Sequence, residues 1–189
     1  MNKDFWESRY ANNNTGWDLG QPSTPLVEFI DQLPSKDLKI LIPGCGNAYE
    51  AEYLIQKDFT NVHVIDLVEQ PLESLKKRVG DSNSLHIHCE DLFNHEGKYD
   101  LILEQTIFCA IDPSRRSDYA KKMAQLLVDN GIYAGVLFDR DFEGGPPFGG
   151  SREEYRAIFT QHFKKLSLED CANSIEPRRG SEVFVQFIK

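Results

Sequence analysis

The residues best suited to chemistry lie in a short glycine turn and in a carboxylate farther along the chain. The run Leu41–Glu50 reads LIPGCGNAYE, so a strand-like segment leads through Gly44-X-Gly46 into a helical segment. Glycines let the backbone turn tightly and approach a ligand beside the free amides of a helix N-terminus. Asp66 follows Gly46 by about 20 residues, where a carboxylate can accept both hydroxyls of an adenosine ribose. Together these residues predict a site for an adenosine-containing cofactor.

This turn lacks the third glycine of the dinucleotide fingerprint, because Ala48 and Tyr49 follow Gly46. In that fingerprint the glycines bring the backbone close to a pyrophosphate. The pattern therefore favours S-adenosylmethionine (SAM), which has no pyrophosphate, over NAD. A Gly-X-Gly turn can also serve packing alone, so that interpretation stays open.

Two further carboxylates follow predicted strands. Asp91 comes just after the third strand and Glu104 ends the fourth. The carboxyl ends of parallel strands meet at one edge of a sheet, where ligands bind in such folds. We expect Asp91 to accept a hydrogen bond from an adenine amino group and Glu104 to lie near the methionine ammonium or the sulfonium. Acids at strand ends can also serve only as helix caps and solvent-facing groups.

Strand-like and helical segments alternate along the chain. The predicted strands are 38–42, 62–66, 84–88, 99–104 and 132–138, followed by 163–168 and 182–188. Alternation of this kind is typical of βαβ units and a largely parallel sheet. The last two strands have no helix between them, which predicts an antiparallel hairpin at the end of the sheet.

Three helices carry clear end signals. Pro25 opens an apolar pattern that runs to residue 33, and Asp112 caps a helix that we expect to stop at Asn130-Gly131. Ser151 and Glu154 form a capping box before a third helix. The predicted fold is α/β, a Rossmann-like class I methyltransferase plan with a mostly parallel seven-stranded sheet and a C-terminal antiparallel hairpin.

An ordered series of motifs occurs along nearly the whole chain and supports this fold prediction. The motifs are Trp6-Glu7-X-X-Tyr10, Trp17-Asp18-X-Gly20, LIPGCG, IDL, EDLF, FCAIDP, Tyr119-Ala120, GGPPF and PRRG-X-Glu182. In these motifs the sequence resembles the thiopurine S-methyltransferase superfamily, and within it the plant-type halide and thiol methyltransferases. The resemblance implies SAM-dependent methyl transfer to a thiol, bisulfide, thiocyanate or halide ion.

The resemblance also implies roles for individual residues. It places Trp6, Tyr10 and Trp17 in an N-terminal lid over SAM, formed within residues 1–35, with Tyr10 where a tryptophan is common; core packing of these aromatics is the alternative. It places the SAM contacts at Gly44 (methionine part), Asp66 (ribose), Asp91 and Leu92 (adenine) and Glu104 (amino-acid end). Gly46 and Leu67 are also expected to bind the cofactor.

One departure from the family concerns the methyl acceptor. Phe148 stands where the plant-type enzymes have a tyrosine after GGPP, and Asp139-Arg140-Asp141 is more charged than the corresponding family stretch. The residues expected on the acceptor side are Phe148, Arg140, Tyr10 and Arg178. Surface arginines can also serve solubility alone.

A soft anion can attack the SAM methyl group directly, in line with the departing sulfur. The protein then has to align the reactants and remove water from the anion, and a general base is optional. The five histidines are scattered, and Cys45 and Cys109 are interpreted as structural. We therefore assign no catalytic side chain.

Three other interpretations remain. The first is a methyltransferase of the same fold that acts on another small organic or metalloid acceptor. The second is a metal-binding protein built on His86-X-His88-Cys89, which lacks a fourth ligand at diagnostic spacing and which we disfavour because central parallel strands are usually buried on both faces. The third is a SAM-binding interaction module without turnover. Our prediction includes no metal.

Length and composition limit the domain organisation and the partners that the sequence allows. The 189 residues fit one domain, and the net charge of −9 opposes binding to nucleic acid or to an anionic membrane. The longest apolar run, residues 132–138, is too short to span a bilayer, and the four cysteines are widely spaced. We expect a single cytoplasmic domain over residues 1–189 that takes a small-molecule acceptor, with no protein partner evident.

Overall fold

The computed structural model describes all 189 residues, and its seven strands form one sheet. The strands are β1 (Ile40–Pro43), β2 (Val62–Asp66), β3 (Leu85–Cys89), β4 (Tyr99–Gln105), β5 (Leu127–Phe138), β6 (Lys165–Asp170) and β7 (Glu182–Ile188). Their order across the sheet is β3-β2-β1-β4-β5-β7-β6. Strands β1 to β5 are parallel, whereas β7 is antiparallel to both β5 and β6. The predicted parallel sheet with an antiparallel C-terminal hairpin is confirmed.

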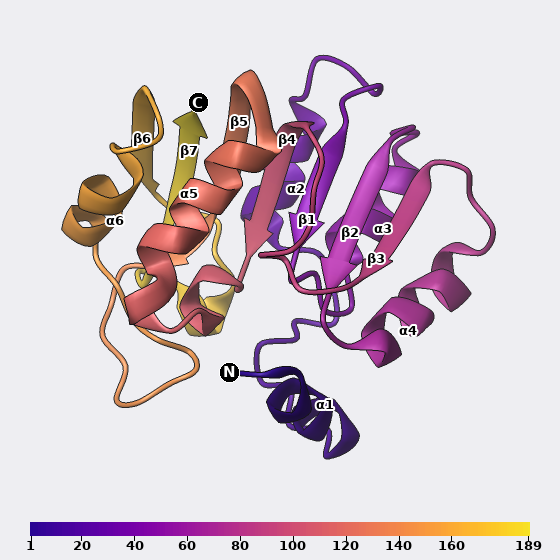
Figure 1. Cartoon of the computed structure of the whole chain (residues 1–189), viewed down its shortest axis with the longest axis horizontal. Coiled ribbons are helices and arrows are strands. Elements are labelled where there is room, and N and C mark those ends of the chain that lie inside the picture. The colour runs from indigo at the N-terminus through magenta and orange to yellow at the C-terminus, as the bar shows by residue number, and fades with distance from the viewer.

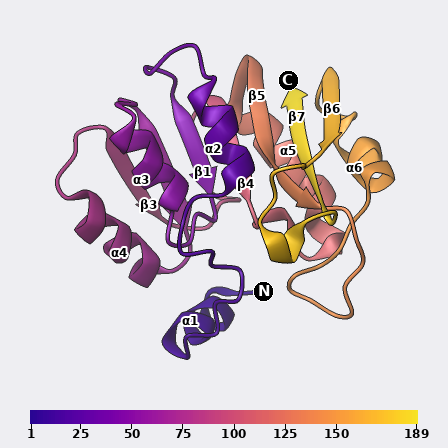
Figure 2. The same ribbon diagram turned by 180° about the vertical axis from the view of Figure 1, so that it is seen from behind.

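Helices lie on both faces of this sheet (Figures 1 and 2). They are α1 (Lys3–Ala11), α2 (Thr24–Asp31), α3 (Tyr49–Gln56), α4 (Glu69–Val79), α5 (Arg116–Leu126) and α6 (Arg152–Phe159). Short 3-10 turns cover Phe108–Ala110, Pro113–Arg115 and Glu176–Arg178. Helix α1 lies apart from both layers, beyond the carboxyl ends of β1 and β2 (Figure 1). None of the helices combines the length and the apolar content needed to cross a bilayer.

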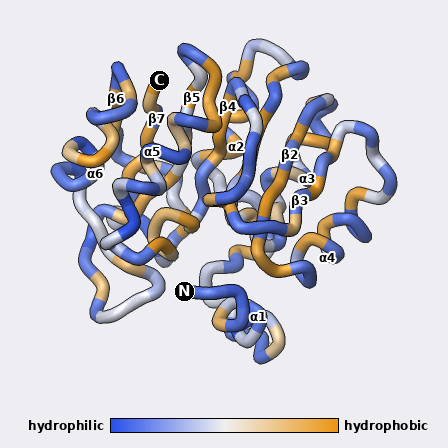
Figure 3. Tube along the Cα trace, in the orientation of Figure 1, coloured by the Kyte–Doolittle hydropathy of each residue, from blue (hydrophilic) through white to orange (hydrophobic).

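The sheet separates two apolar clusters, which fix the faces of the strands. Ile40 and Ile42 pack with residues of α2, α3 and α4, whereas Leu41 packs with residues of α5 and α6. This alternation follows from the two-residue period of a strand. Figure 3 shows hydrophobic residues concentrated along the central strands and hydrophilic residues in the connecting loops. Each fully buried leucine or isoleucine contributes about 1.5–3 kcal/mol, so the clusters hold the strand ends rigidly in register.

The helix predicted from Asp112 to Asn130-Gly131 is shorter than expected. Asp112 caps the 3-10 turn Pro113–Arg115 that precedes α5, because its carboxylate accepts the Ser114 N–H at 2.9 Å, and α5 itself begins only at Arg116. Helix α5 ends at Leu126, and Leu127 already pairs with Tyr99 of β4. Asn130 has a φ of +63° and lies within β5, between the residues where the register with β4 shifts. The Asn-Gly signal therefore marks an irregularity of the strand, not the end of the helix.

The connection between β3 and β4 contains no helix. Residues 90–98 form a loop, so no helix in this connection covers the β2–β3 end of the face on which α5 packs. His63, His86 and His88 lie on that end of the face. The expectation of burial on both faces applies to central strands, and β3 lies at the edge of the sheet, where His86 is exposed and His88 is half-buried.

Candidate active site

A cavity of about 570 Å³ opens at the carboxyl ends of the parallel strands. Its walls come from the glycine turn after β1, the ends of β2 and β4, and the loop after β3. The N-terminal segment and the loop after β5 complete it, and Figure 1 shows both of these segments at that same edge of the sheet. A volume of this size is typical of small-molecule sites. The topology therefore brings together residues that are far apart in the sequence.

The turn after β1 requires glycine at two positions. Gly44 has a φ of +54°, and a Cβ there would lie 2.4 Å from Cδ1 of Ile107. Gly46 has a φ of +52°, and a Cβ there would lie 3.0 Å from the hydroxyl oxygen of Tyr10. L-residues with side chains rarely adopt this left-handed conformation. Both glycines line the cavity.

Asp66 connects the end of β2 to this turn. One carboxylate oxygen accepts the Gly46 N–H at 2.9 Å, and the other accepts the Val68 N–H at 2.9 Å. Burial raises the pKa of Asp66, and these N–H donors partly oppose the rise. Asp66 and the adjacent Leu67, both expected to bind the cofactor, line the cavity.

The loop after β3 contributes Asp91 and Leu92, and both line the cavity. Oδ1 of Asp91 accepts the Phe93 N–H at 2.9 Å, which stabilises the turn. No hydrogen bond within the protein uses Oδ2, so this oxygen is available to a ligand. Leu92 is buried in the core cluster that includes α5.

Three aromatic residues form the N-terminal wall. The Trp17 ring packs edge-on against the rings of Trp6 and Tyr10, with centroids 5.5 Å and 5.8 Å away. All three line the cavity. The side chain of Asn47, in the glycine turn, donates a hydrogen bond to Asp18. The N-terminal segment thus contacts the turn directly. Burial and the nearby Asp66 carboxylate raise the pKa of Tyr10, so its hydroxyl stays protonated.

Both arginines expected on the acceptor side, Arg140 and Arg178, also line the cavity. Arg178 is nearly buried, and its guanidinium contacts the Trp17 carbonyl oxygen at 3.1 Å and Glu182 at 3.4 Å. Arg140 is exposed, and its guanidinium lies over the Phe142 ring, 4.7 Å from the centroid.

Phe148, expected on the acceptor side, does not line the cavity. Its ring occupies the space beside Gly145, where a Cβ would lie 2.3 Å from Cδ1 of Phe148. Its backbone N–H donates to the Cys109 carbonyl oxygen at 2.6 Å. The two preceding prolines line the cavity instead. The loop conformation therefore turns the phenylalanine ring away.

Glu104 also differs from its expected placement, because it lies in the core behind the cavity. Its side chain is 0% exposed, and Oε1 accepts the Phe108 N–H at 2.8 Å. Burial raises the pKa of Glu104 to about 8, so the side chain is mainly neutral at pH 7. A strand places successive side chains on opposite faces, and the residue that reaches the cavity is the next one, Gln105.

Gln105 and Arg115 are cavity residues that the sequence reasoning missed. Oε1 of Gln105 is buried and has no hydrogen-bond partner within the protein. Arg115 lies with its guanidinium 3.9 Å from the centroid of the Phe93 ring. Gln105 could have been predicted as a cavity residue, because it follows the predicted end of a strand by one position. Nothing in the sequence points to Arg115.

The titratable groups of the cavity do not include a histidine or a lysine. Cys45 and Cys109 line it, but burial raises the pKa of both thiols, that of Cys109 to about 12. The Cys109 thiol donates to the Thr106 carbonyl oxygen at 3.1 Å. Neither thiol is therefore an activated nucleophile.

Similarity to known proteins agrees with this geometry. The chain is 29% identical over 184 residues to "Probable thiol methyltransferase 2" of Arabidopsis thaliana, with 94% of this chain and 81% of the relative covered. It is 25% identical over 197 residues to "Thiopurine S-methyltransferase" of Photobacterium profundum, with 95% and 92% covered.

A solved structure with the same fold is the 1,6-didemethyltoxoflavin-N1-methyltransferase of Burkholderia thailandensis, which contains S-adenosylhomocysteine. The TM-score is 0.75 at 16% identity, with 99% of this chain and 86% of that chain covered. The model of the family "Thiopurine S-methyltransferase (TPMT)" matches residues 1–188. The chain therefore belongs to the thiopurine S-methyltransferase family and is a SAM-dependent methyltransferase.

Proposed function

We propose that this enzyme transfers the SAM methyl group to a small soft nucleophile, which is a thiol, bisulfide, thiocyanate or halide ion. The observation that carries the proposal is the composition of the cavity wall. The wall combines the glycine turn and Asp66 with aromatic, proline and arginine side chains, and it includes no histidine or lysine. Such a wall suits a nucleophile that is already ionised and needs no general base.

The cofactor end of the cavity fits SAM. Asp66 and Asp91 supply carboxylate oxygens for the ribose hydroxyls and the adenine amino group. The buried, unpartnered Oε1 of Gln105 is an acceptor suited to the methionine ammonium. Gly44 and Gly46 leave room for close approach, because side chains at either position would meet Ile107 or Tyr10.

In this proposal the segment before α2 acts as a lid over the cofactor. The lid is shorter than the expected residues 1–35, because α2 packs in the core cluster with β1. Trp6, Tyr10 and Trp17 present aromatic rings to the cavity, and a ring face attracts a cation such as a sulfonium. The Tyr10 hydroxyl lies close to Gly46, so lid and cofactor turn form one wall. The lid also removes water from the reacting groups.

The acceptor end lies toward the loop after β5. Arg140 provides positive charge at this end within a protein whose net charge is −9, and this charge attracts an anion, whereas the charge of Arg178 is balanced by its ion pair with Glu182. Apolar surface at this end excludes water from the anion. It is supplied by Phe138, Phe142 and the loop prolines.

The reaction is a direct displacement. SAM supplies an activated methyl group. The anion donates an electron pair to the methyl carbon, and the carbon–sulfur bond breaks with its electrons remaining on the sulfonium sulfur. No proton has to move when the nucleophile is an anion. The protein contributes alignment and dehydration, which together supply much of the rate enhancement.

The test is headspace gas chromatography of the enzyme incubated with SAM and, separately, with iodide, bisulfide, thiocyanate or an aromatic thiol. S-adenosylhomocysteine is quantified in parallel, and the Asp66→Ala variant serves as the matched control. We expect a methylated product with at least one of these acceptors and much less with the variant. If SAM binds but neither product forms with any of them, the acceptor assignment is wrong and another organic or metalloid acceptor takes its place.

A further inference from the structure

Four of the five histidines gather outside the methyl-transfer cavity, on the β2–β3 end of the sheet face described above. His63 stacks on His86 and on His88, with ring centroids 4.4 Å and 5.4 Å apart. His95, from the loop after β3, packs edge-on against His88 at 4.7 Å. None of these histidines lines the cavity. The methyl-transfer reaction does not account for this cluster.

The residues of this cluster are not those of the sequence pattern His86-X-His88-Cys89. Residues 86 and 88 share a face of β3, as their spacing predicts, but Cys89 points to the other face. The Cys89 thiol lies 3.9 Å from the Leu67 carbonyl oxygen. Glu90 and His95 come close to His88 instead.

The hydrogen bonds of the cluster determine which ring nitrogen of His88 is free. Nε2 of His63 lies 2.9 Å from Oδ1 of Asn61, an acceptor, so this nitrogen carries the proton. Nδ1 of neutral His63 then accepts from Nε2–H of His88 at 3.1 Å. Nδ1 of His88 is left with a lone pair, and it lies 3.9 Å from the Glu90 carboxylate. A cation placed between these two acceptors would interact favourably with both.

His95 supports the same arrangement. Its Nδ1 lies 2.8 Å from the same Glu90 oxygen, and its Nε2 lies 2.7 Å from the Tyr99 hydroxyl. A histidine that binds a metal through one nitrogen commonly donates its other N–H to an oxygen acceptor. Tyr99 provides that acceptor for His95, and His63 provides an imidazole nitrogen for His88.

We infer that His88, Glu90 and His95 bind a divalent transition-metal ion of the zinc type. One ligand atom from each residue lies within 4.8 Å of the others. Two histidines and one glutamate form a known zinc ligand set, with water in the fourth position. The side chain of His95 is 3% exposed and anchors the site, whereas those of His88 and Glu90 are 30% and 42% exposed. The exposed ligands can adjust to the ion and give it a path from solvent.

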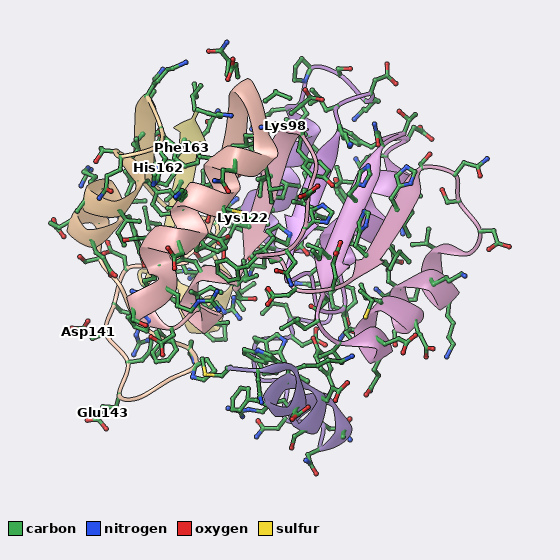
Figure 4. The ribbon with its side chains drawn as sticks, in the orientation of Figure 1. Lys98, Lys122, Asp141, Glu143, His162 and Phe163 are labelled. Atoms are coloured by element: carbon green, nitrogen blue, oxygen red, sulfur yellow. The ribbon has the colours of Figure 1, made fainter.

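The test is isothermal titration of the metal-free protein with zinc chloride. We expect one ion per chain, and at least a tenfold weaker affinity for His88→Gln and for His95→Gln. Three matched controls should bind like the unchanged protein. His86→Gln removes an exposed histidine of the same face, and Cys89→Ser removes the exposed thiol. His162→Gln removes a histidine in the turn after α6, far from β3 in Figure 4.

The melting temperature is a second measure of zinc binding. Zinc should raise the melting temperature of the unchanged protein, because a ligand that binds only the folded state stabilises it, and should not raise that of His88→Gln. If His95→Gln does not fold, His88→Gln decides, because that side chain is partly exposed. Zinc affinity unchanged in His88→Gln, or abolished in Cys89→Ser, would overturn the assignment.

Discussion

Nη2 of Arg178 donates a hydrogen bond to the backbone carbonyl oxygen of Trp17 at 3.1 Å, although 161 positions separate them. The same guanidinium lies 3.4 Å from Oε1 of Glu182, and the two side chains are only 11% and 6% exposed. The turn before β7 therefore holds the aromatic wall of the cavity against the rest of the protein.

We expect Arg178→Ala to weaken both folding and cofactor binding. Removing one partner of a buried ion pair costs about 3–5 kcal/mol, because Glu182 is left as an uncompensated charge. Trp17 also loses its anchor, so the affinity for S-adenosylhomocysteine should fall. Urea denaturation and isothermal titration measure the two effects.

The double variant Arg178→Ala, Glu182→Gln separates these effects. It should recover most of the lost stability, because the unpaired charge is gone, but it should not recover affinity. Full recovery of affinity in the double variant would show that Arg178 does not act by positioning Trp17.

Asp66→Ala should weaken SAM binding by about 1.5–3 kcal/mol, since a charge-assisted acceptor is lost. The variant also removes the acceptor of the Gly46 N–H, so thermal melting is needed beside titration calorimetry. Asp66→Asn retains an oxygen for Gly46 and is the matched control, with an intermediate loss expected. An affinity equal to that of the unchanged protein in Asp66→Ala would remove this residue from the cofactor site.

Glu104 should make stability depend on pH. Its pKa is about 8 in the folded protein, against an ordinary 4.5, so the folded state holds the extra proton between these values. The free energy of unfolding therefore falls as the pH rises through this window. The stabilising contribution of the neutral Glu104 side chain is complete only below about pH 4.5. Glu104→Gln has no proton to lose and keeps an oxygen for the Phe108 N–H.

We expect Glu104→Gln to be less dependent on pH between pH 5 and 9, and more stable than the unchanged protein above about pH 8, by an amount on the order of a few kcal/mol. Urea titrations across this range measure it. Glu96→Gln, in the exposed loop before β4, is the control and should leave the pH profile unchanged. Parallel profiles for Glu104→Gln and the unchanged protein would contradict the prediction.

Phe148→Tyr should have little effect on acceptor preference. The ring packs beside Gly145 and does not line the cavity, so relative rates with thiocyanate and bisulfide should change by less than about twofold, as for a substitution away from the site. Phe142→Leu, at a position that does line the cavity, is the comparison and should change these rates more. A larger effect at Phe148 would mean that the loop after β5 moves when substrate binds.

Much of the fold was predictable because its signals are local. Strands and helices repeat their apolar residues with periods of 2 and 3.6, and the caps at Asp112 and Ser151 lie where hydrogen bonds confirm them. The end of α5 was not predictable from its Asn-Gly signal, because pairing with Tyr99 draws Leu127 into β5. Long-range pairing overrides a local turn signal there.

The sequence by itself determined the order of the elements, the glycine turn and the placement of Asp66, since these depend on spacing along one βαβ unit. Only the tertiary structure decided that Gln105 and not Glu104 reaches the cavity, because the register of β4 assigns each residue a face. It also decided that Phe148 turns away and that four histidines meet on one face of the sheet. The positions of Phe148 and of the histidines depend on contacts between segments that are distant in the chain, which no local pattern shows.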